Sequence, residues 1–160
     1  MKEKKFPAIG FARPRSVHQA LVAYFCYELI QEVKDSGLWV LPEASLTRNL
    51  NDVSPDILIC TKERELLLIV EFTNRRDAYR VRKKIKERIL SRFPQIEAFM
   101  YNYDTEVWES NIVDAPTVSY SLLLDMDLND IVINANLIDY QEKEEAEVKS
   151  IRRPGIGNVM

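Results

Sequence analysis

The chain has 160 residues, 46% of them apolar, which is the size of one domain and enough apolar side chains for a single core. Its longest apolar runs fall far short of the roughly 18 to 20 residues that a membrane-spanning helix needs. The N-terminus lacks the apolar segment of a secretory signal, so we expect a cytoplasmic protein. Cys26 and Cys60 lie in apolar contexts and are expected to be buried, reduced thiols, and the single histidine excludes a multi-histidine metal site.

The net charge of −3 conceals a strong segregation of charge along the chain. Residues 71–95 carry nine basic and three acidic groups, a balance of +6, whereas residues 96–160 carry four and thirteen, a balance of −9. A basic block favours local contact with phosphate groups, although the overall charge opposes long-range attraction to nucleic acid. The residues predicted to contact nucleic acid are Arg75, Arg76, Arg80 and Lys83.

The first predicted element is a helix over residues 17–35. Ser16 and Gln19 have the spacing of a capping box, and Gly37 is a plausible C-terminal stop. Glu28 interrupts the apolar stripe of this helix. A short strand over residues 38–41 should follow and end at a proline.

Two apolar runs, residues 56–60 and 66–72, are joined by the charged segment 61–65 and predict an antiparallel hairpin. The second run alternates little between apolar and polar residues. Such continuity is typical of a central strand that is covered on both faces.

Apolar residues recur at helical spacing over residues 78–89 and predict an amphipathic helix of roughly four turns. A strand over residues 96–101 and a turn into residues 106–108 should follow. Residues 116–138 indicate a strand plus a short helix or an ordered loop. We expect one domain over residues 1–140 and a charged, flexible C-terminal segment over residues 141–160.

The open end of the hairpin is predicted to bring two carboxylates together. Pairing about a turn near Glu63 places Asp56 opposite Val70 or Glu71, and the period of two places Thr73 on the face of Glu71. An ionised carboxylate at the end of so apolar a strand is costly unless it is paired, hydrogen-bonded or metal-bound. Carboxylates hold Mg²⁺ or Mn²⁺ while leaving coordination positions for water and phosphate. Asp56 and Glu71 are therefore the candidate metal ligands.

These residues carry a resemblance to a known family. Ser54-Pro55-Asp56, the hairpin and Ile69-Val70-Glu71-Phe72-Thr73 resemble the P-D…(D/E)-x-K signature of the PD-(D/E)XK nuclease superfamily. The resemblance covers about residues 16–108 and is strongest to the N-terminal nuclease domains of type I restriction subunits and to small restriction-endonuclease-like proteins. It implies an α/β fold with a restriction-endonuclease-like αβββαβ core, in which helices flank a mixed central sheet.

The resemblance also implies an activity, the magnesium- or manganese-dependent hydrolysis of DNA phosphodiester bonds. Asp56 and Glu71 correspond to metal ligands, and Phe72 would add its backbone carbonyl oxygen. Glu28 or Glu43 could add a further acidic group, although both residues also fit purely structural roles.

Thr73 occupies the position of the motif lysine, which in the superfamily is associated with activating the attacking water and stabilising charge. A basic side chain from the following helix is the expected replacement. At 100° per residue, Arg82 lies roughly 40° and Lys86 roughly 80° from Ala78, near the buried stripe, whereas Lys84 points further out. We therefore predict that Arg82 or Lys86 supplies the positive charge.

Two other interpretations stay open. The chain could be a non-catalytic relative of the same fold that binds nucleic acid or a protein, with Thr73 recording the lost lysine. It could also act as a homodimer or within a larger restriction or repair assembly, with the acidic C-terminal segment as a contact surface. The basic helix could be no more than a solvated face. A nucleotide-binding loop is not expected, since the four glycines form neither G-x-x-x-x-G-K nor G-x-G-x-x-G.

Overall fold

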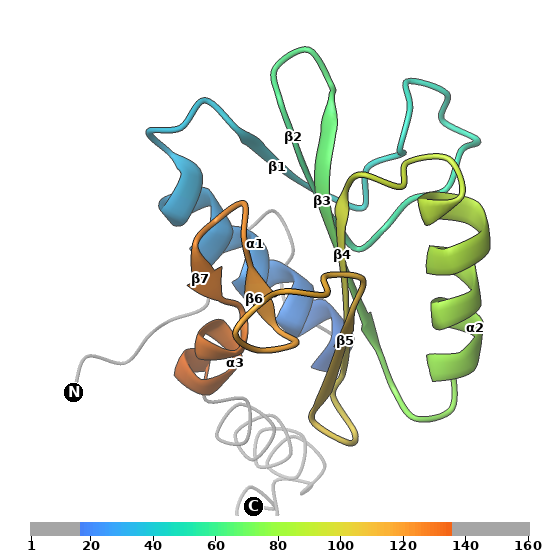
Figure 1. Ribbon diagram of the computed structural model, residues 1–160, viewed down its shortest axis with the longest axis vertical. Coiled ribbons are helices and arrows are strands. Elements are labelled where there is room, and N and C mark those ends of the chain that lie inside the picture. The colour runs from blue at the N-terminus through green and yellow to red at the C-terminus, as the bar shows by residue number, and fades with distance from the viewer. Residues whose placement is uncertain (1–16, 136–160) are drawn as a thin grey trace, which may run out of the picture.

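The computed structural model describes residues 17–135 and contains a five-stranded mixed sheet with helices on both faces (Figure 1). The predicted α/β class is therefore confirmed. The expected capping residue Ser16 and the expected C-terminal segment 141–160 lie outside the described residues. The elements in chain order are α1 (Val17–Val33), β1 (Trp39–Pro42), β2 (Ile57–Cys60), β3 (Leu66–Thr73), α2 (Ala78–Lys84), the π-helix η1 (Ile85–Leu90), β4 (Glu97–Asn102), β5 (Val107–Ser110), β6 (Tyr120–Ser121), β7 (Met126–Asp127) and α3 (Asn129–Ala135).

The sheet has the strand order β1-β2-β3-β4-β5, so β3 is its central strand, as its continuous apolar sequence predicts. β2 and β3 form the predicted antiparallel hairpin, in which Ile57 pairs with Val70. This register places Asp56 beside Glu71, one of the two predicted arrangements. β3 and β4 are parallel, because α2 and η1 carry the chain back across the sheet between them.

The sheet separates two apolar cores, and the side chains of β2 show how. Ile57 and Ile59 point into the core beneath α1 and α3, whereas Leu58 and Cys60 point into the core beneath α2 and η1. This alternation is the ordinary period of a strand. Cys26, in the first core, and Cys60 are both buried free thiols, as predicted.

The basic helix follows its predicted pattern closely. Val81, Ile85 and Ile89 are its buried residues, while Ala78 at its start is only partly buried. The helix runs through α2 into the π-helical turn η1 without a break, because Ile85 keeps right-handed helical backbone angles. It ends at Leu90, before Pro94.

The region after β5 contains the predicted short helix and two short strands where the sequence indicated one. Leu128 and Ile131 carry α3 into the core beneath α1. The indole N–H of Trp108 donates to the side-chain oxygen of Asn129, 3.0 Å away, and ties β5 to α3. Within residues 17–135 none of the helices has both the length and the apolar character that a membrane span requires.

Removing one ring from the larger core tests this packing. Phe25 is fully buried, and its ring centroid lies 4.9 Å from that of Phe72 and 6.1 Å from that of Trp108. Phe25→Ala should lower the free energy of unfolding by about 3 to 5 kcal/mol in a urea titration, through lost burial and a cavity. Tyr27→Ala is the matched control on the same helix, since Tyr27 is 41% exposed and lies outside the core, and should lower the free energy of unfolding much less than Phe25→Ala does.

Candidate functional site

Three acidic residues lie side by side where β1 ends, β2 begins and β3 ends. Pro42 pairs with Ile57 and Ile57 pairs with Val70, so the next positions along the strands are Glu43, Asp56 and Glu71. The backbone N–H of Glu43 donates to the backbone carbonyl oxygen of Asp56 at 2.9 Å, which extends the β1–β2 pairing by one residue. Glu43 adopts a φ of 51°, a left-handed conformation that is uncommon for residues other than glycine.

Asp56 is held by two elements besides its own strand. Its Oδ2 atom accepts a hydrogen bond from the backbone N–H of Phe72 at 2.7 Å. Its Oδ1 atom lies 3.1 Å from Nε2 of His18, near the start of α1. The carboxylate therefore joins the beginning of β2 to the end of β3 and to the first turn of α1.

Glu71 is the most buried acidic group of the site. Its side chain is 3% exposed, and Nζ of Lys84 lies 2.7 Å from its Oε1 atom. The same ammonium donates to the backbone carbonyl oxygen of Ser54 at 3.1 Å. The pKa of Glu71 is raised to about 7, chiefly by burial and also by the charge of Asp56 and a hydrogen bond with it, while Lys84 acts in the opposite direction. The buried carboxyl group therefore holds its proton more tightly than an exposed glutamate does.

His18 completes the cluster. The hydrogen bond to Asp56 raises the pKa of His18, and although partial burial lowers it, the negative charges of Asp56, Glu71 and Glu43 raise it further. The sequence offered no signal for this role, because a lone histidine early in a helix is ordinarily a surface or capping residue. Only the packing of α1 against the sheet brings it to the carboxylates.

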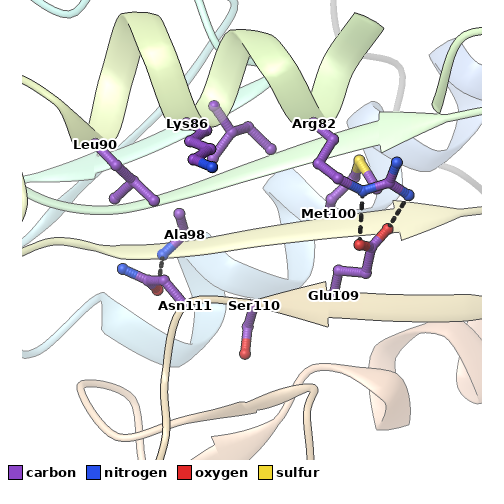
Figure 2. Close-up of a pocket in the computed structure, with 9 residues that line it drawn as sticks. Arg82, Lys86, Leu90, Ala98, Met100, Glu109, Ser110 and Asn111 are labelled. Atoms are coloured by element: carbon purple, nitrogen blue, oxygen red, sulfur yellow. Dashed lines mark hydrogen bonds and ion pairs between the residues drawn. The ribbon is translucent and has the colours of Figure 1, made fainter. Parts of the chain in front are cut away.

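Lys84, and neither of the two predicted basic residues, lies at the site. Figure 2 shows Arg82 turned towards Glu109 of β5, with guanidinium-to-carboxylate distances of 2.7 and 2.8 Å. Lys86 lies with Arg82 along a cavity of about 220 Å³ between this helix and the β4–β5 edge. The predicted placement of Arg82 and Lys86 is therefore wrong.

The error has a simple physical reason. Helical phase gives the angle of a side chain from the buried stripe, which here runs through Val81 and Ile85. It does not tell which flank of that stripe faces which strand. Arg82 and Lys86 lie on the flank that faces β5, and Lys84 lies on the flank that faces β2 and the end of β3.

Of the other predicted residues, some lie at the site and others do not. Glu43 lies beside Asp56, but Glu28 lies ten residues beyond His18, about 15 Å further along α1, so its predicted place at the site is also wrong. Thr73 is buried two residues after Glu71 and donates its hydroxyl to the backbone oxygen of Asn74 at 3.0 Å. The carbonyl oxygen of Phe72 stays a predicted ligand. The predicted nucleic-acid contacts Arg75, Arg76, Arg80 and Lys83 are all exposed.

Comparison with known proteins adds no assignment. No protein-family model matches the chain, and no curated protein matches it. The chemistry of the site must therefore be inferred from its own atoms.

The oxygen donors of the site fit a hard divalent cation. In the described part of the chain, no three His, Cys, Asp or Glu side chains form a ready-made metal-binding group. Mg²⁺, however, usually binds through one or two carboxylates and keeps several waters. Asp56 and Glu71 supply two carboxylates whose repulsion raises the pKa of Glu71. A divalent cation would relieve that repulsion, so the donor chemistry fits Mg²⁺ or Mn²⁺.

The site predicts how stability depends on pH when divalent metal is removed with EDTA. The pKa of Glu71 is about 7 in the folded protein, above its ordinary value of 4.5, so between these values the folded protein binds more protons than the unfolded chain. His18, with its raised pKa, acts in the same direction: its contribution is full below 6.5 and is lost as the pH rises through its folded pKa. Stability should therefore fall as the pH rises from 5 to 8.

Urea unfolding at several pH values measures this effect. The difference between the ordinary pKa of Glu71, 4.5, and its pKa in the folded protein, about 7, corresponds to about 3 kcal/mol in the free energy of unfolding. Glu71→Gln should therefore remove most of the pH dependence of stability. His18→Asn should remove part of what remains. Glu87→Gln, at an exposed glutamate of η1, should leave the slope as it is. A native slope that Glu71→Gln does not reduce would contradict the assignment of Glu71.

Proposed function

We propose that the protein is a divalent-metal-dependent nuclease-like enzyme that hydrolyses phosphodiester bonds in DNA. The observation that carries this proposal is the carboxylate of Glu71, buried at the end of the central strand, with Asp56 beside it and an ammonium 2.7 Å from its Oε1 atom. Two carboxylates that can hold a metal ion and one cation that can stabilise developing negative charge are a sufficient set for phosphodiester hydrolysis.

The arrangement of elements supports a place in the PD-(D/E)XK superfamily. The order α1, β1, β2, β3, α2 and β4 corresponds to the αβββαβ core expected of a restriction-endonuclease-like fold. In this proposal Asp56 and Glu71 occupy the two acidic positions of the signature, and Thr73 occupies the position of its lysine. The missing charge is then supplied by Lys84, from the following helix.

Each side chain has a role in the proposed reaction. Asp56, Glu71 and the carbonyl oxygen of Phe72 would hold Mg²⁺ or Mn²⁺, which supplies a water of lowered pKa and stabilises charge on the phosphate. The backbone N–H of Phe72 and His18 orient the carboxylate of Asp56. Lys84 is a compact point charge on a flexible stem, so it can shift from Glu71 to a phosphate oxygen.

The exposed basic residues at the start of α2 support a nucleic-acid partner. Arg75, Arg76, Arg80 and Lys83 follow β3, the strand that contains Glu71 and ends two residues after it, so phosphates held by them would lie near the proposed site. A cytoplasmic location and a homodimer or larger restriction or repair assembly belong to the same proposal.

One observation favours a second candidate function. Both oxygens of Asp56 and the Oε1 atom of Glu71 already have partners within the chain. A non-catalytic domain that binds nucleic acid or a protein would need no more from Lys84 than to neutralise a buried carboxylate.

Cleavage of plasmid and single-stranded DNA in Mn²⁺ or Mg²⁺ separates these candidates. Asp56→Asn and Glu71→Gln should lower the cleavage rate by at least about 100-fold, because they remove charged metal ligands. Lys84→Met should lower it by about 100- to 1,000-fold, because it removes a charge that stabilises the transition state. Lys86→Met, on the other flank of the helix, should cleave at the native rate.

Calorimetric titration with Mn²⁺ completes the test. Metal binding that Asp56→Asn and Glu71→Gln abolish, without cleavage by the native protein, would favour the non-catalytic function. If neither substitution changed metal affinity or cleavage, the proposed site would be wrong. A loss of cleavage in Lys86→Met equal to that in Lys84→Met would contradict the role of Lys84.

A further inference from the structure

Tyr79, the second residue of α2, exposes most of its aromatic ring. Its side chain is among the most exposed large apolar groups of the described chain, at 74%. A ring so exposed adds little to the core by burial. Basic residues surround it in the sequence, so an aromatic surface is interleaved with positive charge at the start of this helix.

The cationic side chains around Tyr79 differ in whether they form ion pairs with other described residues. Lys84 is paired with Glu71 and Arg82 with Glu109. Among residues 17–135 the side chain of Arg80 has one ion pair, a long contact of 3.7 Å to the exposed carboxylate of Asp77. The side chain of Lys83, like that of Arg76 just before the helix, makes no hydrogen bond or ion pair with any residue from 17 to 135. The cations nearest to the ring are thus available to a ligand.

These residues form a continuous path around the helix. At 100° per residue, Tyr79 is followed around the axis by Lys83, then Arg80 and then Lys84, within a sector of about 140°. On a helix with a diameter of 10 to 12 Å, that sector spans about 12 to 15 Å of surface. The path begins at the exposed ring and ends at the ammonium that contacts Glu71.

We infer that Tyr79 is a stacking platform for an unpaired base of a single strand, whose phosphates follow Lys83 and Arg80 towards Glu71 and Lys84. The inference rests on the proposed action on nucleic acid and specifies its substrate class. An aromatic ring binds the face of any base, whereas in a duplex both faces of each internal base are already stacked. The platform therefore selects single-stranded or frayed DNA over an intact duplex.

Equilibrium binding in EDTA tests the platform apart from cleavage. Fluorescence anisotropy compares a labelled oligo(dT) strand with a duplex of the same length, at several salt concentrations, using the full-length protein. Tyr79→Ala should weaken binding of the single strand roughly 5- to 150-fold, with little effect on the duplex and no change in the salt dependence. Tyr79→Phe should bind as the native protein does, because the ring suffices.

Two further variants show that the effect belongs to this ring. Lys83→Ala should weaken binding of both substrates. It should also reduce the slope of log affinity against log salt concentration by about 1, the change expected when one phosphate contact is lost. Tyr27→Ala removes an exposed aromatic side chain from α1, outside the path, and should bind both substrates as the native protein does. Thermal unfolding of each variant confirms that it is folded.

The outcomes separate this inference from the proposed function. Tyr79-dependent binding of the single strand without metal-dependent cleavage would overturn the nuclease proposal and keep the platform. Cleavage with native single-strand affinity in Tyr79→Ala would overturn the platform alone. Equal losses for strand and duplex, or no binding of the single strand by the native protein, would also overturn it.

Discussion

The burial of one carboxylate, that of Glu71, constrains the rest of the site. A charge at the end of the central strand, covered on both faces, is destabilising unless a partner compensates it. Lys84 is that partner, and it can reach Glu71 only if α2 crosses the sheet with one flank over β2 and β3. The same ammonium fixes the loop before β2 through the carbonyl oxygen of Ser54. A single ammonium group thus links the helix, the loop before β2 and the third strand, in addition to the core packing of Val81, Ile85 and Ile89.

Asp56 imposes a second constraint, through its contact with α1. Its two oxygens bind the backbone of β3 and His18 of α1, so the two carboxylates draw together both helices that cover the sheet. Buried ion pairs are often no more stabilising than apolar residues of similar volume, since desolvation of buried charge often exceeds the Coulombic gain. This arrangement therefore favours a chemical role for the carboxylates over a purely structural one.

The sequence predicted the features that depend on the period of a strand. It did not predict which helix side chains reach the site, because that depends on how the helices pack on the sheet. The hairpin register follows from two apolar runs and one charged turn, so the meeting of Asp56 and Glu71 was predictable. The choice of Lys84 over Arg82 was not, because phase within a helix carries no information about the strand beneath each flank. The distance of Glu28 from the site and the nearness of His18 depend on how α1 lies along the sheet. Periodicity within α1 cannot show this.

The distribution of ion pairs explains how an acidic protein can present a basic surface. Glu109 neutralises Arg82 on the β5 flank of the helix, and Asp52 pairs with Arg92 beyond its end at 2.7 Å. Glu71 takes up Lys84 on the opposite flank. Within residues 17–135 the acidic groups thus pair with the flanking cations and leave the side chain of Lys83 without an ion pair. Because exposed charges separated by more than about 8 to 10 Å are largely screened at physiological salt, distant negative charge of the chain does little to offset the positive charge at Lys83.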